Sequence, residues 1–176
     1  MKPILIVNTG GTFNKIYNPL TGDLDIDTKG NALKTISRKW LTDFEVINII
    51  NKDSLEMDAA DRLYIFQTIQ ESHVQAIIVV HGTDTMDQTA AYLQEHQINK
   101  TIVLTGAMVP FSIDPIEATA NLSSAYGFLQ GLSNDGVYIA MHGKVELYPI
   151  LKKNRERGYF EIERAYKYNN TVRVNL

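Results

Sequence analysis

Side chains that are able to do chemistry follow directly after the apolar runs of this sequence. Thr12 ends the string "TGGT" (9–12), and Thr83 and Asp84 lie at the centre of "HGTDT" (81–85), after the run "AIIVV". A threonine hydroxyl is a weak nucleophile at neutral pH unless a base lies within hydrogen-bond reach. The glycines of "TGGT" could bring the backbone close to a ligand that Thr12 then attacks, so one hypothesis is nucleophilic chemistry at Thr12.

Each of these motifs also has a purely structural interpretation. Two glycines after a strand permit a tight turn, and Asp84 is suited to cap a helix that begins at Thr85. A phosphate-binding loop has little support, because no Lys-Ser/Thr follows "TGGT" and no G-x-G-x-x-G occurs. His81 and His142 lack the spacing of a metal site, so we expect structural histidines and no metal. The residues alone leave both interpretations open.

The composition limits the class of protein. The 176 residues, 44% of them hydrophobic, are enough for a single domain with its own core. The net charge of −3 argues against a nucleic-acid partner. No cysteine is present, which excludes disulfides and thiolate catalysis. The first apolar run, "ILIV" (4–7), is too short for a secretory signal or a membrane-spanning helix, so we expect a cytoplasmic protein that has no membrane partner.

Short apolar runs alternate with segments of helical periodicity. The runs are rich in β-branched residues and predict buried parallel strands at 4–7, 46–50, 76–80, 101–105 and 137–141. Caps and apolar stripes predict four helices. The apolar stripes are Leu33, Ile36 and Trp40 in the first helix, Leu63, Phe66 and Ile69 in the second, Met86, Ala90 and Leu93 in the third, and Ala118, Leu122, Ala125 and Leu129 in the fourth. The starts of the last three helices are predicted at the capping pair Asp58 and Asp61, at Asp84, and at Asp114, Pro115 and Glu117.

This alternation predicts an α/β fold: a doubly wound, flavodoxin-like, mostly parallel sheet with helices on both faces, in a single domain. Ligands of such sheets bind at the carboxyl ends of the strands. The strings "NTGGT", "NKDSLEM", "HGTDT" and "TGAM" all follow predicted strands, so we expect them to meet at that edge. Residues 13–30 form a long polar stretch with a predicted hairpin at "NPLTGD", and a loop of this kind is suited to act as a lid.

Three strings together carry a resemblance to a known family. "TGGTF" (9–13), "HGTDTM" (81–86) and "LTGAM" (104–108) resemble signature motifs of the amino-terminal domain of the bacterial-type L-asparaginases, in the same order and at the same strand ends. The resemblance extends over roughly residues 3 to 160, and two signatures of this length are specific. It implies an asparaginase amino-terminal-type domain over residues 1–176, without the carboxy-terminal domain of full-length members.

The resemblance implies a role for each matching residue. Thr12 corresponds to the nucleophile that the substrate amide acylates, and Tyr17, on the lid, would help to activate it. Thr83 and Asp84 correspond to the inner catalytic group together with Lys153, although Lys152 lies next to it and the alignment is weak there. The lysine must be unprotonated to accept a proton from threonine. The implied reaction is a double displacement without a cofactor, in which ammonia leaves, an acyl-threonine forms and water releases aspartate.

Substrate binding is implied at the same strand ends. Without the resemblance, Ser54 would be interpreted as an ordinary turn serine. In the family, the matching position holds the substrate α-carboxylate. Thr83 and Asp84 bind the substrate as well, and backbone N–H groups at the glycine turns of Gly11 and Gly82 can stabilise the oxyanion. The implied substrate is a small amino-acid amide, L-asparagine and, more slowly, glutamine, and the shared sites of the family imply a homodimer or a higher homo-oligomer.

The sequence also departs from the family pattern. The carboxy-terminal domain of a neighbouring subunit supplies the acidic residue that grips the substrate ammonium in full-length members, and no residue here corresponds to it. Leu55 stands where a glutamine is frequent, and Val109 changes the usual "GAMRP" to "GAMVP". The substrate ammonium is therefore expected to be held mainly by Asp84, with a partner chain completing the site. Two alternatives to an asparaginase stay open: a non-catalytic or partner-dependent amino-acid-binding domain, and an amidase for another amide, including one carried on tRNA and recognised by a separate subunit.

Overall fold

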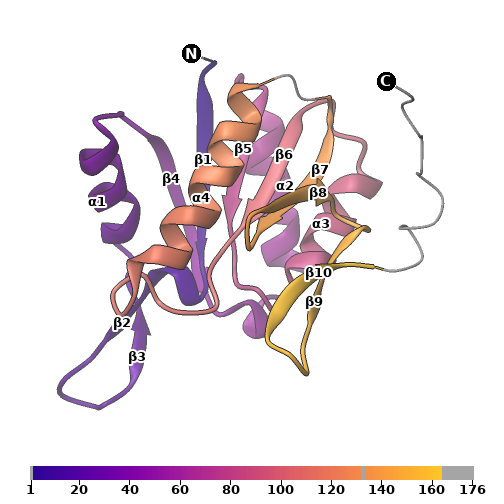
Figure 1. The fold of residues 1–176 in the computed structure, drawn as a ribbon. Helices are drawn as coiled ribbons and strands as arrows, with labels where there is room; N and C mark the ends of the chain where they lie inside the picture. Colours follow the sequence, from indigo (N-terminus) through magenta and orange to yellow (C-terminus); the bar gives the residue numbers. More distant parts are fainter. Residues whose placement is uncertain (1, 132–133, 164–176) are drawn as a thin grey trace, which may run out of the picture.

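A computed structural model of the protein describes residues 2–131 and 134–163 (Figure 1). Six strands form the main sheet in the order β4-β1-β5-β6-β7-β8. They are β1 (Ile4–Gly10), β4 (Glu45–Lys52), β5 (Ala76–Val80), β6 (Thr101–Thr105), β7 (Gly136–Met141) and β8 (Lys144–Leu147). The first five strands of this order are parallel, and β8 is antiparallel to β7. Strand order and direction confirm the predicted flavodoxin-like fold class. Residues 164–176 of the predicted 1–176 domain lie outside the described residues.

Four helices cover the two faces of the sheet. They are α1 (Asn31–Trp40), α2 (Ala59–Glu71), α3 (Met86–Glu95) and α4 (Pro115–Gln130). Successive residues of a strand face opposite sides, so Leu5 and Val7 of β1 pack in the core with α2 and α3, whereas Ile4 and Ile6 pack with α1 and α4. This division explains why the strands are continuous apolar runs. No helix within the described ranges is long and apolar enough to cross a membrane.

Two predictions of buried apolar surface are partly wrong. The run 46–50 was expected to be buried, but β4 is an edge strand, and Ile47 is exposed while Ile49 is buried. The predicted stripe of α2 included Leu63, which is exposed, whereas Ile65 and Ile69 are fully buried. The helix is therefore rotated relative to the prediction. The stripes predicted for α3 and α4 are buried as expected.

The helix starts test the predicted caps. Asp58 and Asp61 form the expected capping box at the start of α2. Asp114 accepts a hydrogen bond from the Ile116 N–H at the start of α4. The cap predicted at Asp84 is wrong, because α3 begins at Met86 and its N-cap is Thr85, without a side-chain hydrogen bond. Salt bridges to Lys153 and Arg155 engage the Asp84 carboxylate instead.

Two hairpins lie beyond the main sheet, at its carboxyl end (Figure 1). The first consists of β2 (Lys15–Tyr17) and β3 (Leu24–Ile26), joined by the predicted turn at 18–23. The second consists of β9 (Leu151–Asn154) and β10 (Tyr159–Ile162), which were not predicted. In the view of Figure 1 they leave opposite sides of the sheet edge. Two 3-10 turns, η1 (Thr12–Asn14) and η2 (Ser54–Glu56), follow β1 and β4.

Backbone contacts hold the carboxyl ends of three strands together. A Cβ atom on Gly11 would lie 2.5 Å from both Cα and the backbone nitrogen of Gly82, and φ of Gly11 is +71°. A Cβ atom on Gly82 would in turn lie 2.6 Å from the hydroxyl oxygen of Ser54. Side chains at residues 11 and 82 would therefore separate the loops that follow β1, β4 and β5.

His81, the residue after β5, is a neutral buried histidine. Its Nδ1 lies 2.7 Å from the carbonyl oxygen of Gly82, and its Nε2 lies 2.9 Å from the hydroxyl of Thr89. Nδ1 therefore carries the hydrogen, which it donates to the carbonyl, and Nε2 accepts from the threonine. Burial in the core lowers the pKa of His81 to about 4, because it disfavours the charged ring.

The contact at Gly11 predicts a specific loss of stability. We expect Gly11→Ala to lower the free energy of unfolding by about 1–3 kcal/mol more than Gly143→Ala does, since the new methyl group must displace backbone. Gly143 is a matched control, because its φ is +74° and no atom lies within 4 Å of the point that a methyl group there would occupy. Urea unfolding of the two variants measures the difference. Equal losses would contradict the close contact.

The buried His81 predicts a dependence of stability on pH. Between pH 6.5 and 4 the unfolded chain binds a proton at His81 that the folded protein excludes, so stability falls as the pH is lowered through this range. The loss amounts to about 3 kcal/mol when the whole range is crossed. Urea unfolding from pH 8 to 4 measures it, and we expect a shallower decline in His81→Asn. Parallel curves for the two proteins would show that His81 does not cause the decline.

Candidate active site

The candidate site lies at the carboxyl edge of the sheet, between β1 and β5. The crossovers reverse direction between these two strands, and ligands of open α/β sheets bind at such a point. Thr12 opens the turn η1 after β1, and Ser54 opens η2 after β4. Thr83 and Asp84 follow β5. The glycine contacts described above bring these three loops to one place.

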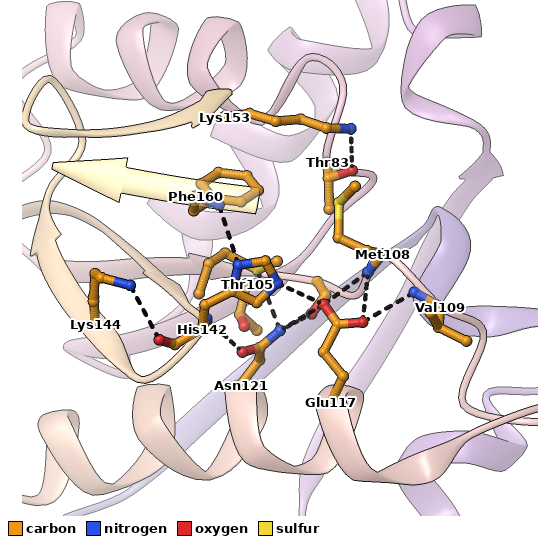
Figure 2. Close-up of polar contacts among 12 residues, drawn as sticks. Thr83, Thr105, Met108, Val109, Glu117, Asn121, His142, Lys144, Lys153 and Phe160 are labelled. Carbon is orange, nitrogen blue, oxygen red and sulfur yellow. Dashed lines mark hydrogen bonds and ion pairs between the residues drawn. The ribbon is translucent and has the colours of Figure 1, made fainter. Parts of the chain in front are cut away.

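Lys153 reaches this edge from the β9–β10 hairpin. Its ammonium nitrogen lies 2.8 Å from the hydroxyl oxygen of Thr83 and 2.9 Å from a carboxylate oxygen of Asp84 (Figure 2 draws the first contact). The side chain of Lys153 is only 14% exposed. Lys152 instead forms an ion pair of 3.2 Å with Glu163. Because adjacent residues of a strand point to opposite faces, only one of the two lysines can reach Thr83.

Arg155 is a member of the site that the sequence analysis missed. Its guanidinium lies 3.0 Å from the same carboxylate oxygen of Asp84 and also donates to the Asp84 carbonyl oxygen. From this segment only a lysine, Lys153 or Lys152, is expected from the family resemblance. The available signal was the period of two of a strand, which places residues 153 and 155 on one side, but no strand was predicted in this segment. The Asp84 carboxylate thus forms ion pairs with both Lys153 and Arg155.

A small hollow adjoins this charged group. Its volume is about 70 Å³, and its lining consists of Thr83, Asp84, Asp87, Leu151, Lys152, Lys153, Arg155 and Phe160. Acidic, basic and hydroxyl groups therefore face a space large enough for a few atoms of a ligand.

Thr12 and Tyr17 are placed differently from the group around Lys153. Thr12 is half-buried beside the contact of Gly11 with Gly82, and among the described residues its hydroxyl has no hydrogen-bond partner. Tyr17 lies on β2 and is 60% exposed. The structure thus joins Thr83, Asp84 and Lys153, places Thr12 on the neighbouring loop, and leaves Tyr17 on an open hairpin.

Ser54 and its neighbour Asp53 tie η2 to the site. Ser54 is fully buried, its carbonyl oxygen accepts from the Thr85 hydroxyl at 2.7 Å, and its hydroxyl lies 3.4 Å from the Thr85 N–H. Burial acts to raise the pKa of Asp53, but the Lys15 ammonium at 2.6 Å and the Leu55 N–H outweigh it, so the pKa lies below its ordinary value. This ion pair connects η2 to the β2–β3 hairpin. Leu55 itself is exposed.

The two histidines at strand ends have protein partners. Both ring nitrogens of His81 are hydrogen-bonded, as described above, and those of His142 contact Glu117 and the Phe160 backbone. Within residues 2–131 and 134–163 no three His, Asp or Glu side chains are grouped to hold a metal ion. The available chemistry is that of hydroxyl, ammonium and carboxylate groups.

Comparison with known proteins places this geometry in a family. Residues 3–163 match the family described as the amino-terminal domain of asparaginase. An L-asparaginase of Thermococcus kodakarensis is 28% identical over 160 residues, covering 88% of this chain and 48% of that protein. A probable periplasmic L-asparaginase of Haemophilus influenzae is 30% identical over 155 residues, covering 81% of this chain and 43% of the other. A glutamyl-tRNA(Gln) amidotransferase polypeptide of Methanococcus vannielii is 26% identical over 154 residues, which make up 83% of this chain and 35% of that polypeptide.

Solved structures agree with the sequence comparison. The thermostable L-asparaginase of T. kodakarensis superposes with a TM-score of 0.78 at 28% identity, over 92% of this chain and 51% of that one. A probable cytoplasmic L-asparaginase of Campylobacter jejuni also gives 0.78, at 26% identity, over 92% of this chain and 54% of that one. The chain spans about half the length of these relatives. With the family match over residues 3–163, it belongs to the asparaginase family and corresponds to the amino-terminal domain of its members.

Proposed function

We propose that this chain hydrolyses the side-chain amide of L-asparagine to L-aspartate and ammonia through a threonine acyl-enzyme. The observation that carries the proposal is the Lys153 ammonium, which contacts both Thr83 and Asp84 next to the loop of Thr12. A lysine that is largely shielded from solvent and shared between a hydroxyl and a carboxylate is suited to move a proton. Family membership supports the same chemistry. Glutamine is a second candidate substrate, with slower turnover.

The proposed reaction divides the work among four residues. The Thr12 hydroxyl attacks the amide carbon and gives its proton to Thr83, which passes its own hydroxyl proton to Lys153 in the unprotonated form of the lysine. Asp84 orients the lysine. The tetrahedral oxyanion is stabilised by backbone N–H groups of the loops that contain Gly11 and Gly82. Lys153 then returns the proton to the amide nitrogen, which leaves as ammonia, and a water molecule that attacks the ester releases aspartate and restores Thr12.

Tyr17 and Ser54 have proposed roles that require movement or exchange of partners. Tyr17 assists Thr12 only if its hairpin closes over the site, because the ring is open to solvent. Ser54 holds the substrate α-carboxylate only if its hydroxyl turns from the Thr85 N–H to the ligand. Cytoplasmic location and homo-oligomeric assembly stay predictions.

A specific contact favours a second candidate, an amino-acid-binding domain that needs a partner for catalysis. Arg155 bonds to the carboxylate of Asp84, the group expected to receive the substrate ammonium. An ammonium would be a third cation on that carboxylate unless Arg155 moves away. In this alternative the domain binds an amino acid or an amide without efficient turnover. Calorimetry with asparagine and aspartate, beside an ammonia assay, separates the two candidates.

The nucleophile is tested by Thr12→Val. We expect ammonia release from asparagine to fall to background while the melting temperature stays within a few degrees, because valine keeps the shape and removes the hydroxyl. The control is Thr119→Val on α4, since Thr119 is also half-buried. Release of ammonia by the Thr12 variant at the wild-type rate would remove Thr12 from the mechanism. Binding of asparagine by the wild-type protein without any ammonia would favour the binding domain.

The base is tested by Lys153→Met beside Lys152→Met. We expect the first substitution to lower kcat by about 10²–10⁴-fold, the usual contribution of general acid–base catalysis. The second should lower kcat far less, because Lys152 pairs with Glu163 and does not contact Thr83. Steady-state ammonia assays measure both. A larger loss in the Lys152 variant would contradict the assignment.

A further inference from the structure

The hairpin that delivers Lys153 is its own two-stranded sheet, apart from the six strands of the main sheet. Its position relative to Thr83 depends on contacts that cross from β9 and β10 to the main body. Leu151 and Phe160 are buried in the core on the α2–α3 side of the sheet. In addition, the Phe160 backbone N–H donates to Nδ1 of His142 at 3.1 Å. His142 follows directly after β7, so this bond ties β10 to the main sheet.

The register of the hairpin places this bond beside Lys153. Phe160 of β10 is the antiparallel partner of Lys153 of β9. The backbone point that His142 holds is therefore directly across from the residue whose side chain contacts Thr83 (Figure 2). A shift of Phe160 along or away from the sheet moves Lys153 with it.

The hydrogen bonds of His142 specify its tautomer. Nδ1 accepts the Phe160 N–H, so Nδ1 carries no hydrogen. The ring hydrogen is therefore on Nε2, which lies 3.1 Å from the Glu117 carboxylate and donates to it. The His142 backbone N–H donates to the Asn121 side-chain oxygen at 2.8 Å. Both the ring and the backbone of His142 are held by α4.

Glu117 is itself fixed by the loop after β6. Its carboxylate accepts the backbone N–H groups of Met108 at 3.0 Å and of Val109 at 3.0 Å (Figure 2). These donors keep the carboxylate turned toward His142. The hydrogen-bonded chain thus runs from the "TGAM" loop through Glu117 and His142 to Phe160, and across the hairpin to Lys153.

We propose that His142 is a positioning residue for Lys153. Oriented by Glu117 in its Nε2–H tautomer, it accepts the Phe160 N–H and sets the place of the β9–β10 hairpin, and so the contact of Lys153 with Thr83. The functional consequence rests on the proposed reaction, in which Lys153 receives the proton. The placement of Lys153 itself does not depend on turnover, and it can be measured separately.

Two amide substitutions separate the two ring nitrogens of His142. Asparagine carries its side-chain oxygen near the position of Nδ1, so His142→Asn keeps an acceptor for the Phe160 N–H and loses the donor to Glu117. Glutamine carries its amide nitrogen near the position of Nε2, so His142→Gln keeps that donor and loses the acceptor. Each variant removes one hydrogen bond, and only the glutamine variant removes the one that reaches the hairpin.

The main readout is the reactivity of Lys153 toward acetic anhydride, measured by mass spectrometry as a ratio to Lys152 in the same chain. In the wild-type protein we expect Lys153 to react more slowly, because its side chain is 14% exposed and that of Lys152 is 49% exposed. The ratio should rise several-fold in His142→Gln, with faster hydrogen exchange at the Phe160 amide, and should stay near the wild-type value in His142→Asn.

Enzyme kinetics provide a second readout. We expect kcat for asparagine to fall about 10- to 100-fold in His142→Gln with KM within about twofold, since displacement of a catalytic group by an ångström costs on this order. His142→Asn should keep most of the wild-type kcat. A wild-type protein without turnover would reject the proposed reaction, while the labelling ratio would still test His142. Equal labelling ratios in the two variants and the wild type would overturn the positioning role.

Discussion

The close packing of backbone at the carboxyl edge of the sheet is the constraint on which the site depends. Gly11 lies against Gly82, and Gly82 lies against Ser54, with no room for a side chain between them. Three loops that are far apart in the sequence are thereby brought together. Thr12 and Thr83, which follow these glycines, therefore lie on adjacent loops at this edge. The two glycine motifs therefore serve as contacts between loops as well as turns.

The charges at the site are arranged around one carboxylate. Asp84 accepts from Lys153 within the site and from Arg155 at its rim, where the arginine side chain is 59% exposed. An exposed ion pair contributes little stability, so Arg155 can be displaced at small cost. The pair with Lys153 is more shielded, and its geometry is further constrained by the hairpin. The Asp84 carboxylate therefore acts as the ion-pair partner of Lys153 and does not cap α3.

Much of the fold could be predicted from the sequence, because buried parallel strands and capped helices have strong local patterns. Ile78 and Val80 belong to such a run, and the capping pair of Asp58 with Asp61 forms as predicted. The exposure of an edge strand could not be predicted in this way. The apolar run that contains Ile47 resembles the buried runs, and it does not show that its strand has only one neighbour in the sheet. The exposed Leu63 shows that an i, i+3 pattern leaves the rotation of a helix undecided.

The site was predicted less completely, because its members meet through tertiary contacts. The motif strings pointed to Thr83 and Asp84, but the short strands β9 and β10 were not predicted, so the choice between Lys153 and Lys152 as the neighbour of Thr83 required the structure. Arg155 was missed for the same reason. The Glu117 side chain, predicted only as a residue of the first helical turn, bonds instead to the "TGAM" loop and His142. Such long-range bonds leave no periodic signal in the sequence.

Detection of the covalent intermediate is the most direct test of the central claim that this edge of the sheet supports acyl transfer through Thr12. The protein is mixed with asparagine, quenched in acid within milliseconds to seconds, digested and analysed by peptide mass spectrometry. We expect an aspartyl ester on the peptide that contains Thr12, formed as ammonia is released and lost as aspartate appears. Release of ammonia with an ester on another residue, or with none at any quench time while turnover proceeds, would contradict it.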